Sequence, residues 1–160
     1  MNHRQGRLFA AGFCLLVSLS GCGEDGGFIE EDILDQPATG RLDGAPWTAI
    51  EGGAITDPTS NRLNITLFAE DTEECSTFVP TELGIVLTSV PAEEGVYPLN
   101  LDSLDDGVVV NFVNPDNVNF ITTDGLIVVE EITPETVTLR LVAVIGESDI
   151  NGRIVVDRCD

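Results

Sequence analysis

The chain has 160 residues, and 28 acidic against seven basic residues give it a formal net charge of −21. A surface this negative cannot neutralise phosphate groups, which excludes nucleic acid as a partner and opposes docking on anionic lipid head groups. A charged partner would therefore be a cation or a basic protein, although the same charge also serves solubility.

The first residues have the composition of an export signal. His3, Arg4 and Arg7 precede an apolar run over residues 8–19. This run covers about 12 residues, whereas an α-helix needs about 20 to cross the hydrocarbon core of a bilayer. The pattern predicts a cleaved signal peptide over residues 1–21 rather than a membrane-spanning anchor.

The end of the apolar run, Leu19-Ser20-Gly21-Cys22, resembles the lipobox of bacterial lipoproteins. The resemblance implies that diacylglycerol is attached to the Cys22 sulfur, that the leader is cut before Cys22, and that the new amino group receives an acyl chain such as palmitate. Two or three acyl chains, at about 0.8 kcal/mol per buried methylene, anchor a protein stably. Gly23 in place of Asp implies delivery to the outer membrane, on its periplasmic face or at the cell surface. The alternative is an ordinary secretory leader with a chance cysteine.

Removing residues 1–21 leaves 139 residues, enough for one domain, with five arginines against 28 acids and a net charge of −23. Cys14 leaves with the leader and Cys22 takes the lipid. Cys75 and Cys159 remain and predict one disulfide in an oxidising compartment. Closing a loop of about 84 residues stabilises a fold by up to roughly 4.5 kcal/mol. Neither cysteine belongs to a Cys-x-x-Cys motif, which argues against a redox or metal-binding role.

Residues 22–37 are rich in glycine and acids and end in a proline, which predicts a flexible tether between the lipidated cysteine and the domain. A chain of this length spans roughly 20 Å. The alternative is that Phe28, Ile29, Ile33 and Leu34 form a short helical turn that docks on the domain.

Residues 38–160 are predicted to form a single β-domain. In residues 62–69, for example, apolar residues alternate with Asn64 and Thr66, which is the period of a half-buried strand. The pattern predicts strands near residues 39–43, 47–56, 62–69, 83–89, 95–99, 108–113, 117–122, 125–132, 136–146 and 150–158. Strands at this spacing indicate an all-β fold, either an antiparallel sandwich or a closed barrel of nine or ten strands.

Turn residues separate these runs. Asn114-Pro115-Asp116-Asn117 predicts the turn of a hairpin, and Asp124-Gly125 and Asn151-Gly152 predict further turns. Trp47, the only tryptophan, is expected in the core because aromatic side chains supply a large buried area.

The β-region is similar to a group of uncharacterised bacterial lipoprotein domains. The similarity rests on the sequences GRLDGAPW at 40–47, EGVYPL at 94–99 and INGRIVV at 150–156. It implies an envelope β-domain and brings no known activity, cofactor or catalytic residue.

Several common active sites are excluded by composition. The only histidine, His3, lies in the leader, and the chain has no lysine. This removes histidine-dependent nucleophiles, histidine-ligated metals, Schiff bases and the usual phosphate-binding loop. We therefore expect no enzyme but a membrane-anchored domain that binds a protein or a glycan, or that has a structural role in the envelope.

Two alternatives depend on carboxylates. A calcium-stabilised adhesion or sensing module would use loop acids, either Asp102, Asp105 and Asp106 or the run over residues 70–74, because calcium prefers clustered oxygen ligands. Neither run has the spacing of an EF-hand loop. A glycoside hydrolase would need two facing carboxylates, for which Glu130 with Glu131, or Glu73 with Glu74, are candidates.

Overall fold

The structure is a computed structural model that describes residues 27–71, 75, 84–101 and 107–159. It confirms the all-β fold class. No helix in these ranges is long and apolar enough to cross a membrane. The elements, in chain order, are the 3₁₀ helix η1 (Glu30–Asp32) and the strands β1 (Thr39–Leu42), β2 (Ala45–Thr48), β3 (Glu51–Asp57), β4 (Arg62–Phe68), β5 (Ile85–Pro91), β6 (Gly95–Pro98), β7 (Val110–Val113), β8 (Asn119–Thr122), β9 (Gly125–Ile132), β10 (Thr136–Ile145) and β11 (Ser148–Arg158).

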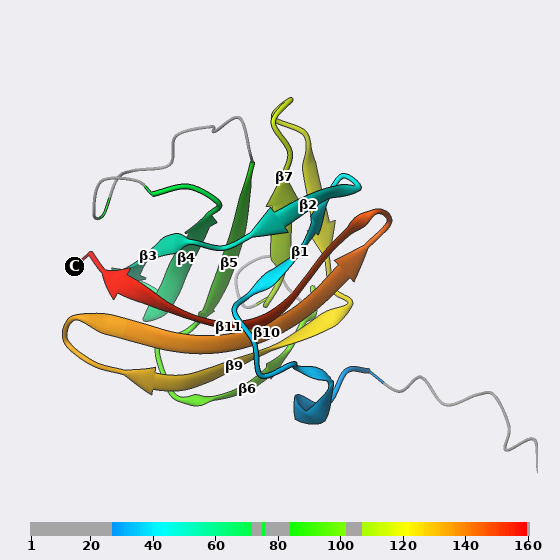
Figure 1. Ribbon diagram of the computed structural model, residues 1–160. Coiled ribbons are helices and arrows are strands. Elements are labelled where there is room, and N and C mark those ends of the chain that lie inside the picture. The colour runs from blue at the N-terminus through cyan, green and yellow to red at the C-terminus, as the bar shows by residue number, and fades with distance from the viewer. Residues whose placement is uncertain (1–26, 72–74, 76–83, 102–106, 160) are drawn as a thin grey trace, which may run out of the picture.

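All these strands belong to one sheet that curls around a single core (Figure 1). The main path runs β6-β9-β10-β11-β3-β4-β5-β7-β8, and the β1–β2 hairpin pairs with β11 beside it. The two arms of the curl meet where the Thr122 hydroxyl of β8 donates a hydrogen bond to the Val144 carbonyl of β10, at 2.7 Å. The sheet is therefore barrel-like and partly closed.

One pair of strands departs from the predicted antiparallel arrangement. β11 runs parallel to β3, with Asp157 opposite Gly53 and Arg158 opposite Ala54. The last strand of the chain thus lies in the middle of the sheet and joins β9 and β10 to β3 and β4. Sequence alternation does not indicate this mixed sheet, because side chains alternate along a strand whatever the direction of its neighbour.

The inner face of the sheet is apolar, as the alternation predicts. Along β4 the apolar residues that point inward are at most 1% exposed, whereas Asn64 and Thr66 face outward. Trp47 is 4% exposed and belongs to this core, as expected, and its indole N–H donates to the Gly84 carbonyl at 3.4 Å.

The strand predicted over residues 47–56 is in fact two strands, β2 and β3. The chain breaks at Ala49 and Ile50 because β2 pairs with β1, whereas β3 pairs with β4 and β11. At the break, the Ile50 N–H donates to the Phe68 carbonyl at 2.8 Å, which turns the chain from one pairing to the next.

The predicted hairpin is confirmed. β7 and β8 pair antiparallel with Asn111 opposite Ile121, and the turn between them ends at Asn117, whose φ is 65°. Asparagine tolerates this left-handed conformation better than most residues, which explains its place in the turn.

Candidate functional site

Residues 28–37 lie against the outer face of the sheet, beside the long curved strands (Figure 1). Ile33 is 5% exposed and packs on Leu126, Val128 and Val142, with Phe28 partly buried next to them. We call the outer surface of β9 and β10 under this segment the covered face. The described part of the predicted flexible tether is thus docked, as the alternative interpretation of the sequence had it.

The sequence of β9 explains why this surface needs a cover. Residues 126–129 are Leu-Ile-Val-Val without a polar residue, so both faces of the strand are apolar and all four side chains are buried. An unbroken apolar run is typical of a strand that is covered on both faces, whereas a half-exposed strand alternates. This run is the signal in the sequence that indicates a docked segment.

A glycine allows the segment to cross β11 at short range. The Arg153 N–H donates to the Gln36 carbonyl at 2.7 Å, and a Cβ atom at Gly152 would lie 2.6 Å from the carbonyl oxygens of both Gln36 and Pro37. A glycine inside a strand often marks such a close approach of another backbone. Asn151-Gly152 therefore lies within β11 and not in the turn that the sequence predicted.

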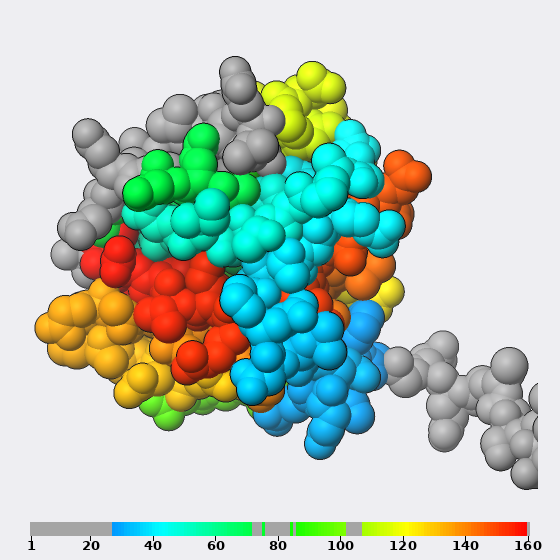
Figure 2. Space-filling model, viewed as in Figure 1, coloured from blue at the N-terminus to red at the C-terminus, as the bar shows by residue number. Residues whose placement is uncertain are grey.

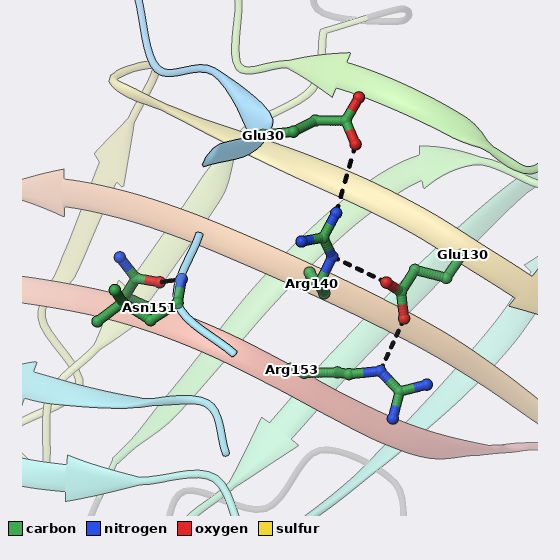
Figure 3. Close-up of polar contacts among 6 residues, drawn as sticks. Glu30, Glu130, Arg140, Asn151 and Arg153 are labelled. Carbon is green, nitrogen blue, oxygen red and sulfur yellow. Dashed lines mark hydrogen bonds and ion pairs between the residues drawn. The ribbon is translucent and has the colours of Figure 1, made fainter. Parts of the chain in front are cut away.

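Asn151 holds the segment through both ends of its side-chain amide. Its Oδ1 accepts a hydrogen bond from the Leu34 N–H at 2.8 Å, and its Nδ2 donates to the Asp32 carbonyl at 2.9 Å. Figure 3 shows this residue beside the segment. Because donor and acceptor are both satisfied, the amide has one preferred orientation.

A ladder of alternating charges continues across the covered face (Figure 3). Arg140 of β10 pairs with Glu30 of η1 at 3.3 Å and with Glu130 of β9 at 2.8 Å. The second oxygen of Glu130 accepts from Arg153 Nε of β11 at 2.7 Å. These side chains are 23–48% exposed, so each pair is worth at most about 1 kcal/mol.

Glu130 reaches both arginines because of an irregularity in β9. Thr138 lies opposite Glu131 and Leu139 lies opposite Val129, so Glu130 is an extra residue on its strand. Bulges of this kind re-aim a side chain. The hydrogen bond to Glu130 raises the pKa of Arg153, and of the predicted carboxylate pair, Glu130 is thus bound by two arginines while Glu131 is exposed.

A hollow of about 470 Å³ lies where the docked segment meets β11. Figure 2 shows the blue-to-cyan N-terminal segment directly against the red C-terminal strand on this side. The hollow is shallow and includes Ile50 and Val155, which are 63% and 50% exposed.

A second hollowed surface lies on the outer side of β4, β5 and β7. Its groove holds about 290 Å³ and continues into a neighbouring hollow of about 500 Å³ with which it shares three residues. We call this surface the open face. The outward side chains along its groove are Asn64, Thr66, Leu87, Ser89, Val109 and Asn111.

The predicted disulfide is present. Cys75 and Cys159 are bonded, with Cα atoms 5.4 Å apart and 84 residues between them in sequence. The Cys159 N–H also donates to the Ala54 carbonyl of β3 at 2.9 Å. The bridge therefore ties the end of β11 to the connection that follows β4.

The other predicted site residues lie outside the described part of the chain. These are the lipidation site Cys22, the calcium candidates Asp102, Asp105 and Asp106, and the pair Glu73 and Glu74. The described residues contain no group of three or more histidine, cysteine or carboxylate side chains placed to hold a metal ion. The calcium hypothesis stays a prediction.

All five arginines that follow the predicted cleavage site make polar contacts that link separate parts of the fold. None was singled out by the sequence. The contacts are Arg41 to Asp149, Arg62 to Ser89 and Gly107, Arg140 to Glu30 and Glu130, Arg153 to Glu130, and Arg158 to Thr133 and Thr56.

Comparison with known proteins identifies no relative, since no family model, curated protein or solved structure matches the chain. The resemblances to the lipobox and to lipoprotein β-domains therefore stay predictions that rest on the residues themselves.

Proposed function

We propose that the chain is a bacterial outer-membrane lipoprotein, anchored by acyl chains on Cys22, whose β-domain binds a partner or supports the envelope and does not catalyse a reaction. The observation that carries the proposal is the disulfide between Cys75 and Cys159. Disulfides persist in oxidising compartments, so the bond supports export. It also accounts for both cysteines that follow Cys22 in the sequence.

The docked segment supports an anchor close to the domain. With acyl chains on Cys22, only residues 23–27 separate the anchor from Phe28 at the edge of the covered face. A fully extended chain spans about 3.3–3.6 Å per residue, which keeps Phe28 within roughly 20 Å of the bilayer. The domain would then sit next to the membrane with the covered face on the anchored side.

The charge distribution supports a neutral or cationic partner. The arginines already link parts of the fold, and the acids greatly outnumber them. An anionic ligand such as nucleic acid would meet net repulsion. A protein or a glycan without negative charge fits this surface best.

Mass spectrometry of the native protein tests the anchor. We expect an N-terminal peptide that begins at Cys22 and carries diacylglycerol and an acyl chain. Cys22→Ser should keep the leader and lose the lipid, whereas the matched variant Cys14→Ser, which changes a cysteine of the leader, should be processed normally. An unmodified N-terminus or an uncut leader in the native protein would overturn the proposal.

Density-gradient separation of the membranes tests the address. We expect the protein in the outer-membrane fraction, and Gly23→Asp should move it to the inner membrane if the lipoprotein sorting pattern applies. Gly26→Asp is the matched control, because it adds the same charge three residues further on and should leave the protein in the outer membrane. Equal distribution of all three proteins would count against the assigned address.

A further inference from the structure

The groove on the open face has the size and depth of a small-ligand subsite. It holds about 290 Å³, close to the lower end of the range for ligand pockets of about 300–1,000 Å³. The neighbouring hollow of about 500 Å³ shares Asn64, Ser89 and Val109 with it and runs toward Asp57 and Arg62. Together they offer an elongated track along β4 and β5 and not a single enclosed pocket.

The side chains of the groove are uncharged. Amides come from Asn64 and Asn111, hydroxyls from Thr66 and Ser89, and aliphatic surface from Leu87 and Val109. A sugar ring presents hydroxyl groups around its rim and C–H groups on its faces, so it matches amides and hydroxyls set around an aliphatic floor. A few placed polar groups on a largely apolar lining are typical of small-molecule recognition.

Asn111 adds an unsatisfied polar atom to this lining. Its Nδ2 donates to Asn119 Oδ1 at 2.9 Å, whereas its Oδ1 is shielded from solvent and has no hydrogen-bond partner among the described residues. Buried polar atoms are nearly always paired in proteins, so an orphaned acceptor calls for a partner from outside the chain. A small rotation of the amide would present this oxygen to a ligand hydroxyl in the groove.

The pairing of the strands disfavours a peptide as the occupant. Peptides commonly bind sheets by adding a strand at a free edge, where backbone groups are unpaired. β4 lies between β3 and β5, and β5 lies between β4 and β7, so the backbone beneath the groove is already paired on both sides. Only side chains remain for recognition, as in the binding of a carbohydrate.

We propose that the groove on the open face of β4, β5 and β7 binds a neutral oligosaccharide, with Asn64, Ser89 and Asn111 contacting its hydroxyl groups. The excess of acids on the chain selects against uronic acids and other anionic sugars. This inference does not depend on the lipid at Cys22, and its failure would leave the proposed anchoring intact.

Calorimetric titration of the full-length protein in detergent tests the proposal. The probes are neutral tetrasaccharides of glucose, mannose, galactose and N-acetylglucosamine, with tetragalacturonate as the anionic counterpart of the galactose probe. We expect at least one neutral probe to bind with a dissociation constant of about 1 mM or tighter, and tetragalacturonate to bind at least about tenfold more weakly than tetragalactose. Failure of every neutral probe to bind at this level would overturn the inference.

Two variants locate the binding. Asn111→Ala should weaken it about tenfold through the loss of a hydrogen bond. Asn64→Trp, at an exposed position, should abolish it by filling the groove. Asn100→Ala is the matched control, because this asparagine caps the loop after β6, away from the groove, and should leave the affinity unchanged. Thermal melts of each variant separate lost binding from lost folding.

Two further results would reject the site. Full binding by a folded Asn64→Trp protein would place the sugar elsewhere on the domain. Binding of a flexible Ser/Asn-rich tetrapeptide in the groove, with no binding of the neutral sugars, would replace the carbohydrate with a peptide ligand.

Discussion

The covered face and the open face are outer surfaces of the same sheet, and they differ because their strands differ in pattern. β9 is apolar on both sides, and its outward residues are buried under Ile33 of the docked segment. β4 alternates, and its outward residues Asn64 and Thr66 line a groove. The comparison teaches that an unbroken apolar strand in a curled sheet indicates a cover from elsewhere in the chain, whereas strict alternation indicates a surface that stays accessible.

Breaking the link between the two parts of the sheet should have the largest effect. Cys159→Ser removes the bridge from the end of β11 to Cys75, which closes a loop of 84 residues. We expect the free energy of unfolding to fall by up to about 4.5 kcal/mol, measured by urea denaturation. Reducing the wild-type protein should shift the transition by the same amount. An unchanged midpoint in both experiments would show that strand pairing alone joins the two parts.

Lifting the segment off the covered face should come next. In Gly152→Ala the new Cβ would collide with the carbonyls of Gln36 and Pro37, and the φ of 138° is unfavourable for alanine. The expected loss is about 3 kcal/mol, with faster proteolysis within residues 28–37. Gly146→Ala is the control, since it also has a positive φ (56°) but open space around its Cβ, and should cost about 1 kcal/mol. Equal losses would show that backbone strain, not the crossing, sets the effect.

A reciprocal exchange of valine and threonine compares the two faces directly. Val142→Thr places a hydroxyl under Ile33 on the covered face, where the native side chain is 3% exposed, and should cost about 1–2 kcal/mol. Thr66→Val makes the opposite change on the open face and should stay within about 0.5 kcal/mol of the wild type. Chemical denaturation of both variants measures the difference. A larger loss for Thr66→Val would reverse the assignment of the two faces.

The smallest effect concerns pH at the end of the open groove. The Ser60 hydroxyl and the Thr59 N–H donate to Asp57 and lower its pKa below the ordinary value of 3.8. The resulting stabilisation is present above that ordinary value and is lost as the pH falls through the lowered pKa. Asp57→Asn should therefore be slightly less stable than the wild type near neutral pH, and the gap in melting temperature should shrink below about pH 4. A gap that is constant with pH would remove the carboxylate as its cause.

Much of the fold follows from the sequence because alternation and turn residues are local signals. The strand positions, the hairpin around Asn114-Pro115-Asp116-Asn117, the buried Trp47 and the pairing of Cys75 with Cys159 were all predictable. The split between β2 and β3 was not, because the pairing partner of each strand decides it and the residues at the break carry no turn signal.

The sites were less predictable than the fold. Docking of residues 28–37 depends on an apolar surface more than 90 residues further along the chain, so the local excess of glycine and acids pointed the other way. Asn151-Gly152 has the composition of a turn, yet in β11 the glycine serves a crossing and the asparagine serves a contact. The groove requires knowledge of which strands are neighbours, and that information appears only in three dimensions.

The central place of β11 has a consequence for how the chain is made. It is the last element to emerge during synthesis, and it is also the strand that pairs with β10 on one side and β3 on the other. A chain that stops before Ser148 lacks the piece that unites two incomplete sheets, each left with a raw edge. Such fragments have no stable stopping point, so folding is all-or-nothing and a prematurely terminated product is marked for degradation.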